Sequence, residues 1–312
     1  MERLQQGKPS LVERAAAKLG VETQPAERPA EPAAEAPPAQ RNGAHVQEAA
    51  SPASVQPIEV PKVVPRSRRA VKIDWGGLQL QGMITPNSSA SRLTEEFRII
   101  KRPLITRAFG DPAERVERGN LIMVTSARPE EGKTFVAINL AISMASERGL
   151  NVLLIDSDFH HPSLPERLGF SAELGLIDVL SDKKLDLSEV LLRTDLPNFA
   201  VLPAGSTTPE TTEILASQRM AAFVDEVSRR YPDRVVIFDA PPVLASSEPS
   251  VLAGHVGQIV FVIEAESTSA TVVQDALGLI SNCPNISLLL NKRQSDGTTE
   301  GFGSYYGYGA GT

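Results

Sequence analysis

The feature that most constrains the fold is a series of short aliphatic runs that alternate with longer segments of helical spacing. The runs comprise residues 120–126, 151–156, 199–203, 234–239, 258–263 and 286–291, and the helical segments 133–148, 217–231 and 270–280. Uninterrupted β-branched runs of this length are typical of strands buried on both faces of a parallel sheet. The segment 133–148 is apolar nearly all round, which predicts a deeply buried helix. The pattern therefore predicts a doubly wound, mainly parallel α/β sheet flanked by helices.

The two ends of the chain differ in composition from this domain. Residues 1–74 contain no aromatic side chain but hold ten of the 24 prolines, so we expect them to be disordered. A short helix over 11–19, capped by Ser10 and stopped by Gly20, is the exception, and it could either dock a partner or have none. We expect the folded domain to span 75–295 and a flexible Gly/Tyr tail to span 296–312. Within the domain, helical spacing predicts a helix from Ser91, which Pro103 kinks or ends.

A phosphate-binding loop is predicted at residues 127–134, ARPEEGKT, which follow one strand and open the next helix. In that context backbone N–H groups at a helix N-terminus face phosphates, the lysine reaches the β/γ oxygens, and the threonine ligates magnesium. Ala127 stands where the usual pattern has glycine. The fold is thus predicted to be P-loop NTPase-like, and the residues expected to bind the nucleotide are Ala127, Arg128, Pro129, Glu130, Glu131, Gly132, Lys133, Thr134 and Phe135.

Three carboxylates follow two further strands. Asp156 and Asp158 come at the end of VLLIDSD, and Asp239 at the end of VVIFD. The carboxyl ends of parallel strands form the ligand crevice of an open sheet, so all three are expected to converge on the phosphate loop. Oxygen ligands of this kind suit Mg²⁺. A single aspartate after a strand is more simply a helix cap, but three beside a phosphate loop favour a metal and a catalytic role.

Composition excludes some classes of partner. The formal net charge of −7 argues against nucleic acid as the main partner, and the lone Cys283 rules out an internal disulfide and favours a reducing cytoplasm. The longest uncharged stretches are too short and too broken to cross a membrane. Any membrane association is therefore expected to come through a partner. The adjacent His160 and His161 point apart and make a poor metal pair.

Together these motifs resemble the bacterial tyrosine kinases, the autokinases of capsule and exopolysaccharide export. The resemblance rests on the loop, LLIDSDFHHPS, LPAG (202–205), TEILAS (212–217), VVIFDAPPVL and the tyrosine-rich tail, and it covers about residues 75–312. EEFRIIKRPL and YYGYG look closest to the autokinases that accompany exosortase-linked clusters. The resemblance implies an ATP- and Mg²⁺-dependent protein-tyrosine kinase.

The resemblance also implies roles for individual residues. Lys133, Asp156, Asp158 and Asp239 would be catalytic; Thr134, Asp156 and Asp239 would hold magnesium, and Asn291 would lie near the adenine. It implies a cytoplasmic protein, peripheral at the inner membrane through a membrane-spanning chain-length regulator that activates it. It further implies a phosphotyrosine phosphatase as a partner and ring-like self-association through Glu95, Arg98 and Lys101. Lys101 stands where the family usually has arginine.

The last twelve residues, GFGSYYGYGAGT, hold three of the four tyrosines. Aromatic residues interleaved with glycine form neither a regular helix nor a stable core, so we expect Tyr305, Tyr306 and Tyr308 to be autophosphorylation sites. Two other functions stay open: a nucleotide-switched partitioning or division-type ATPase, a class that carries lysine at the position of Arg128, and a non-catalytic adaptor that binds ATP to assemble. A sticky low-complexity end is the alternative for the tail.

Overall fold

A computed structural model describes residues 70–88, 91–182, 184–206 and 218–293. The chain divides into Met1–Pro61 and Lys62–Thr312, and every described residue belongs to the second unit. The predicted helix over 11–19, the TEILAS segment and the three tail tyrosines all lie outside the described residues.

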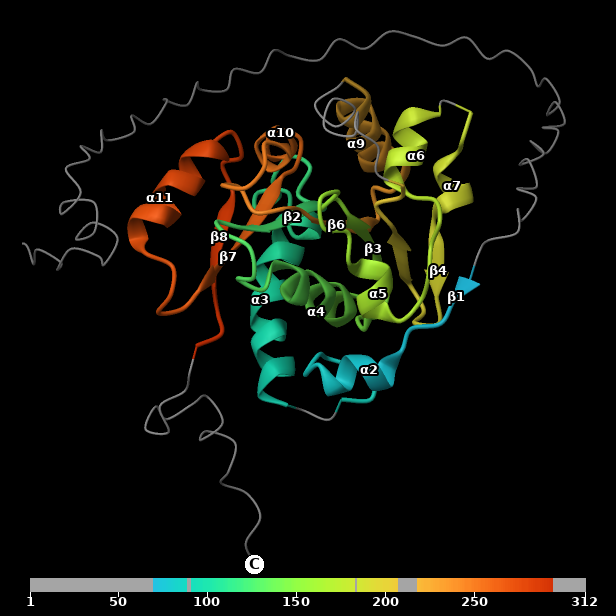
Figure 1. Ribbon diagram of the computed structural model, residues 1–312, viewed down its shortest axis with the longest axis horizontal. Helices are drawn as coiled ribbons and strands as arrows, with labels where there is room; N and C mark the ends of the chain where they lie inside the picture. The colour runs from blue at the N-terminus through green and yellow to red at the C-terminus, as the bar shows by residue number, and fades with distance from the viewer. Residues whose placement is uncertain (1–69, 89–90, 183, 207–217, 294–312) are drawn as a thin grey trace, which may run out of the picture. The chain divides into compact units, whose positions relative to one another are not determined.

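An eight-stranded sheet forms the centre of the domain, in the order β1-β4-β5-β3-β6-β2-β7-β8 (Figure 1). All neighbouring strands run parallel except β4 and β5, which are antiparallel. The predicted mainly parallel sheet is therefore confirmed. Its strands are β1 (Ala70–Val71), β2 (Leu121–Ser126), β3 (Asn151–Asp156), β4 (Leu192–Thr194), β5 (Phe199–Leu202), β6 (Arg234–Asp239), β7 (Gln258–Glu264) and β8 (Ile286–Asn291).

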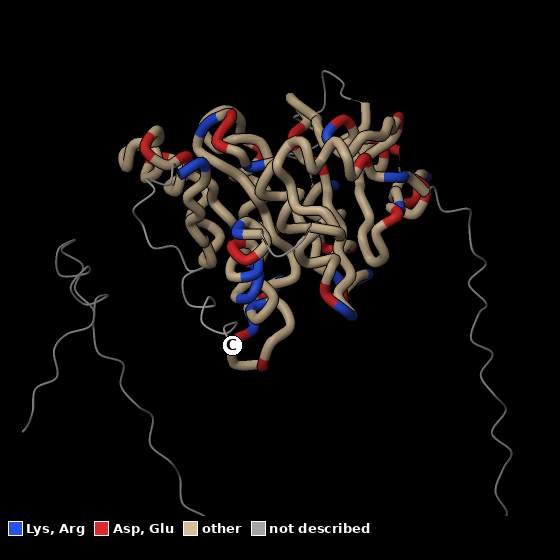
Figure 2. The backbone as a smooth tube through the Cα atoms, turned by 90° about the horizontal axis from the view of Figure 1, so that it is seen from below, with Lys and Arg blue, Asp and Glu red and all other residues tan. Residues whose placement is uncertain are grey.

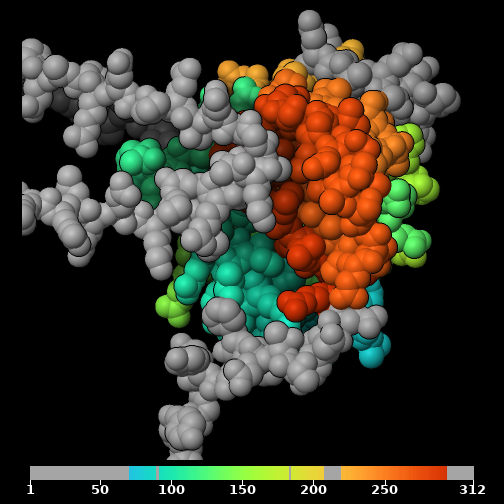
Figure 3. Space-filling model, turned by 90° about the vertical axis from the view of Figure 1, so that its left-hand side faces the viewer, coloured from blue at the N-terminus to red at the C-terminus, as the bar shows by residue number. Residues whose placement is uncertain are grey.

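Helices cover both faces of the sheet (Figure 1). On one face lie α2 (Trp75–Leu80), α3 (Arg92–Phe109), α4 (Lys133–Ala145) and α5 (Leu164–Leu168). On the other lie α6 (Leu176–Ser181), α7 (Leu187–Val190), α9 (Gln218–Arg230), α10 (Glu248–Ala253) and α11 (Ala270–Leu279). Figure 3 shows α11 (orange) on one side of the molecule with α3 (teal) beside it.

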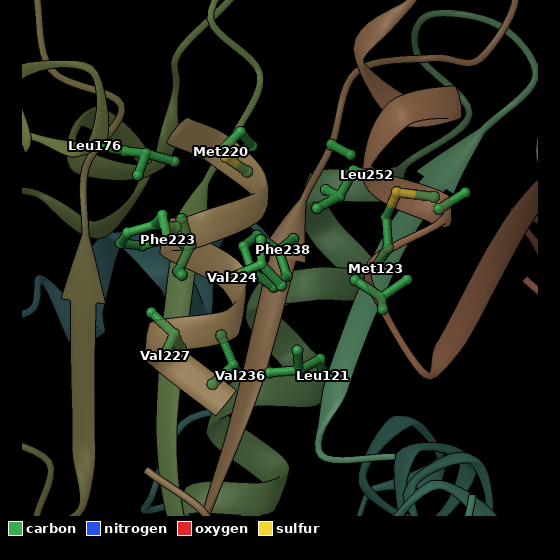
Figure 4. Close-up of a cluster of buried hydrophobic side chains, with 14 of the residues drawn as sticks. Leu121, Met123, Leu176, Met220, Phe223, Val224, Val227, Val236, Phe238 and Leu252 are labelled. Carbon is green, nitrogen blue, oxygen red and sulfur yellow. The ribbon is translucent and has the colours of Figure 1, made fainter. Parts of the chain in front are cut away.

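The alternation of side chains along each central strand explains the two cores. In β6, for example, Val235 and Ile237 pack on the α4 side, whereas Val236 and Phe238 pack on the α9 side. Figure 4 shows the second of these cores, in which α9 lies next to β6. Its labelled side chains are Leu121, Met123, Leu176, Met220, Phe223, Val224, Val227, Val236, Phe238 and Leu252.

Three features differ from the sequence-based expectations. Strands β1 and β4 are two and three residues long, too short to leave a periodic signal, and β1 lies ahead of the expected domain start at Trp75. Strand β8 forms the edge of the sheet, so Leu288 and Leu290 are exposed rather than buried. Of the two outcomes predicted at Pro103, an end of the helix is excluded, since α3 continues to Phe109. Pro103 lies on the exposed side of the helix, where water can satisfy the carbonyl that loses its partner.

Charge is spread over the domain. Lys and Arg alternate with Asp and Glu along the tube rather than gathering on one face (Figure 2). Among the described residues, no helix combines the length and apolar character that a membrane span requires.

Candidate active site

The phosphate loop connects β2 to α4, as the sequence predicts. Its turn depends on Gly132, whose φ of 96° lies in the left-handed region. A Cβ at Gly132 would also come within 2.0 Å of the Asn291 side chain, so only glycine fits there. Lys133 and Thr134 then begin α4, which is buried along almost its whole length and ends at Ala145, three residues before the predicted end.

The loop is tied to two distant segments through Glu131. The Glu131 side chain is 2% exposed; it accepts a hydrogen bond of 2.7 Å from the Arg128 N–H and another from the hydroxyl of Thr268. The Glu131 carbonyl accepts a bond of 2.9 Å from Asn291 Nδ2. Thr268 and the brace through Glu131 were not predicted, because residues 137 and 160 positions apart leave no local signal of contact.

The acidic residues converge on this loop. Strands β3 and β6 are neighbours in a register that places Asp156 opposite Asp239 at their carboxyl ends. Lys133 Nζ lies 2.7 Å from Asp158 Oδ2, so the ion pair joins the loop to the segment after β3. The structure therefore brings Lys133, Thr134 and the three predicted aspartates to one edge of the sheet.

Asp156 has a structural role in addition to its place in the site. Its carboxylate accepts bonds from the backbone N–H groups of Asp158, at 3.2 Å, and of Ser163 and Leu164, both at 3.1 Å. It thereby holds the turn that leads into α5. Burial, together with the negative charge of Asp239, raises the pKa of Asp156 to about 7, although these three N–H bonds oppose the shift.

Asp239 is the most exceptional group in the site. It is 1% exposed, and neither carboxylate oxygen has a hydrogen bond of good geometry within the described residues. Burial raises the pKa of Asp239, although Lys133 and the neighbouring Thr134 hydroxyl lower it. Burial alone would lower the pKa of Lys133, but the charges of Asp239, Asp158 and Asp156 outweigh it and raise that pKa. An unsatisfied buried carboxylate beside a lysine requires a partner that the protein itself does not supply.

These residues fit a magnesium–nucleotide site. Within the described part of the chain, no three His, Cys, Asp or Glu side chains form a complete metal cage. Mg²⁺ does not need one, because it is usually held by one or two carboxylates together with phosphate oxygens and water. The orphaned oxygens of Asp239 and the buried hydroxyl of Thr134 supply what such an ion requires from the protein.

The structure also bears on two other predictions, the adenine contact of Asn291 and self-association through α3. The amide nitrogen of Asn291 donates its hydrogen bond to the phosphate loop. A contact between Asn291 and adenine stays a prediction. Glu95 and Arg98 form a half-exposed ion pair of 2.6 Å on α3. Lys101 is different: its ammonium is buried and bonded within the chain to the Ser143 carbonyl at 2.6 Å and to Glu147 at 2.9 Å. Lys101 is therefore not available to a second chain in this arrangement.

The remaining predicted positions lie at the border of the site. Arg128, Pro129 and Glu130 are exposed along the loop, whereas Ala127 is fully buried at its start and Phe135 is half-buried in α4. His160 lies 3.2 Å from Glu248 on α10.

Comparison with known proteins agrees with this geometry. The family model described as AAA domain matches residues 119–287. The tyrosine-protein kinase YwqD of Bacillus subtilis is 31% identical over 241 residues, which cover 77% of this chain and 95% of that protein. The tyrosine-protein kinase wzc of Salmonella typhimurium is 32% identical over 160 residues, 51% of this chain, and the match spans about a fifth (22%) of its length.

A solved structure gives the same result. The kinase domain of VpsO is 27% identical, with a TM-score of 0.52, and the match covers 65% of this chain and all of that one (100%). The phosphate loop and the acids at and after the ends of β3 and β6 all lie within the matched residues 119–287. The chain therefore belongs to the AAA domain family and, within it, to the bacterial tyrosine-protein kinases.

Proposed function

We propose that this protein is an ATP-dependent protein-tyrosine autokinase that regulates exopolysaccharide synthesis or export and phosphorylates Tyr305, Tyr306 and Tyr308. The observation that carries the proposal is the convergence of Lys133, Thr134, Asp156, Asp158 and Asp239 at the carboxyl edge of the sheet. The relatives named tyrosine-protein kinases support the reaction class.

Each residue of the site has a part in this reaction. Lys133 and the backbone N–H groups of the loop would hold the β and γ phosphates of ATP, and Thr134, Asp156 and Asp239 would hold Mg²⁺, directly or through water. When bound, the magnesium nucleotide supplies the γ-phosphoryl group and neutralises the charge on its oxygens. Burial of Asp156 and Asp239 keeps bulk water from screening these charges.

Asp158 is the residue that we assign to the tyrosine. A phenol with an ordinary pKa near 10 stays protonated at neutral pH, so a carboxylate at the reacting oxygen can orient it and accept its proton. Asp158 is bonded directly to Lys133, which defines the phosphate end of the loop. Its other oxygen accepts the His161 N–H at 3.0 Å, which fixes the orientation of the carboxylate.

The partners follow from the same proposal. Under this proposal a membrane-spanning chain-length regulator activates the kinase, which is peripheral at the inner membrane, and a phosphatase reverses the modification. Self-association would use Glu95 and Arg98, which are about half exposed on α3. Three neighbouring acceptors would give graded charge, since each phosphate adds about −1.5 to −2 at neutral pH.

The decisive experiment incubates the purified chain with Mg²⁺ and ATP and maps phosphotyrosine by mass spectrometry. We expect label on Tyr305, Tyr306 and Tyr308, its loss in Lys133→Met, and its retention in the control Lys184→Met, which changes an exposed lysine outside the site. ATP hydrolysis without phosphotyrosine would instead support a partitioning-type ATPase. Label on Tyr231 alone would refute the tail as the substrate.

A mixing experiment tests whether transfer occurs between copies. A Lys133→Met chain with an intact tail is incubated with an active chain that ends at Asp296. Label on the inactive chain's tyrosines means transfer in trans, which we expect. Its absence, while the intact protein labels itself, would refute the trans route.

A further inference from the structure

A second cavity lies at the end of the sheet opposite to the nucleotide site. It has a volume of about 530 Å³ and is bordered by the first residues of β3, β5 and β6, whereas the nucleotide site lies at the last residues of β3 and β6. Volumes of roughly 300–1,000 Å³ are typical of small-molecule and side-chain binding sites. The proposed reaction uses none of the residues around it.

The cavity is cationic in an otherwise acidic protein. Arg193, Arg230 and Arg234 line it, and none of its lining residues is Asp or Glu, although the chain carries a formal net charge of −7. Arg230 is balanced from outside by Asp186, at 3.4 Å, and Glu226, at 3.1 Å. Arg193 forms no ion pair or side-chain hydrogen bond within the described residues. The cavity thus presents positive charge that the protein neutralises only in part.

The remaining walls are apolar or aromatic. Val152, Leu191, Pro197 and Phe199 lie among the lining residues, and the Arg234 guanidinium stacks over the Tyr231 ring at 4.3 Å from its centroid. Stacking fixes the plane of a guanidinium. The cavity therefore joins planar, two-pronged donors to an apolar wall.

We propose that this cavity binds an aryl phosphate, the phosphotyrosine side chain of the C-terminal tail. Arginine forks match the oxygens of a phosphate in pairs, and the apolar walls match a phenyl ring. An acidic sugar fits less well, because its ring carries hydroxyl groups that need polar partners throughout. The source of the ligand rests on the proposed function, since the tail tyrosines are the proposed product of the kinase. Binding in the cavity would thus depend on whether the tail tyrosines are phosphorylated, at a site separate from that of the nucleotide.

The test is a binding measurement that needs no turnover. Full-length Lys133→Met protein, which cannot modify itself under the proposed function, is titrated calorimetrically with synthetic peptides of residues 301–312. One peptide is phosphorylated at the position of Tyr306 and the other is not. Arg193→Gln is the test variant, because the Arg193 side chain is exposed on the three-residue strand β4 and its loss should leave the fold intact. Arg229→Gln is the matched control: Arg229 is exposed on α9 and bonded to the Asp225 carbonyl, and it is not among the residues that line the cavity.

We expect binding of the phosphorylated peptide only, at least tenfold weaker binding by Arg193→Gln, and unchanged binding by Arg229→Gln. Saturating ATP should leave the affinity unaltered, since the two sites lie at opposite ends of the strands. Equal binding by Arg193→Gln and the parent, competition with ATP, no binding of the phosphopeptide, or preference for an oligogalacturonate would each overturn the proposal. A protein that binds the phosphopeptide in this way but never makes phosphotyrosine would refute the proposed kinase reaction and leave the cavity assignment standing.

Discussion

Asn291 offers a sharp test of how the nucleotide site is held together. Its Nδ2 donates a 2.9 Å hydrogen bond to the Glu131 carbonyl, one residue before the left-handed Gly132. Asn291→Ala removes this brace without adding bulk. We expect the loop to lose part of its preformed shape and the nucleotide to bind less tightly, because binding must then order the loop as well.

The size of the effect follows from the kind of bond. A neutral, part-buried hydrogen bond contributes about 0.5–1.5 kcal/mol net, which corresponds to about 2- to 12-fold in a dissociation constant. The brace acts on the phosphate loop, which contacts the triphosphate that ATP and GTP share. Both nucleotides should therefore lose affinity by the same factor. If Asn291 instead contacts the adenine, ATP should lose affinity and GTP should not.

The assay is calorimetric titration with non-hydrolysable analogues of ATP and GTP in the presence of Mg²⁺. Asn285→Ala is the matched control, because Asn285 lies just before β8 and donates a similar 3.0 Å bond to the Gly257 carbonyl, at the other end of the strand. Asn285→Ala should lower the free energy of unfolding by a similar amount and leave the affinities for both analogues unchanged. A change in the ratio of the ATP and GTP affinities in Asn291→Ala would refute the brace as its role. Unchanged affinities for both would show Asn291 to be a strand-end residue without a part in binding.

Four further predictions concern other parts of the molecule. Asp239→Asn should lower turnover more than a hundredfold, on the order of 3 kcal/mol, yet raise the melting temperature of the nucleotide-free protein, since it removes a buried carboxylate without hydrogen bonds; normal turnover would contradict this. Asp158→Asn should impair transfer to tyrosine more than nucleotide binding, and a variant that loses only thermal stability would identify Asp158 as a structural cap. Hydrogen bonds from Ser188, followed by Arg230, lower the pKa of Asp186 to about 2, so its stabilising effect is present above the ordinary value of 3.8 and is lost as the pH falls through about 2. Asp186→Ala should therefore lower the free energy of unfolding by about 1 kcal/mol at neutral pH. Urea titrations should show that this difference between the variant and the parent becomes smaller in acid, and a difference that stayed constant would argue against this origin. Arg98→Ala should reduce self-association and autophosphorylation together, and an unchanged mass by light scattering would remove Arg98 from the interface.

Most of the catalytic edge could be predicted from the sequence for a physical reason. A buried parallel strand must be a continuous aliphatic run, so VLLIDSD and VVIFD reveal where β3 and β6 end. Once the strands are parallel, their carboxyl ends meet at one edge, and the aspartates that follow them must lie there. The phosphate loop is similarly local, because its turn depends on Gly132 between a strand and a helix.

The tertiary structure alone decided which partner each polar group has. The burial of Lys101 against Ser143 and Glu147 depends on how α3 packs on α4, and nothing in the local sequence around Lys101 records it. The same holds for the brace of Glu131 by Asn291 and for the cavity that gathers arginines from β4, α9 and β6. Periodicity reports which face of an element is apolar, whereas these contacts depend on the order of strands in the sheet, which brings together residues far apart along the chain.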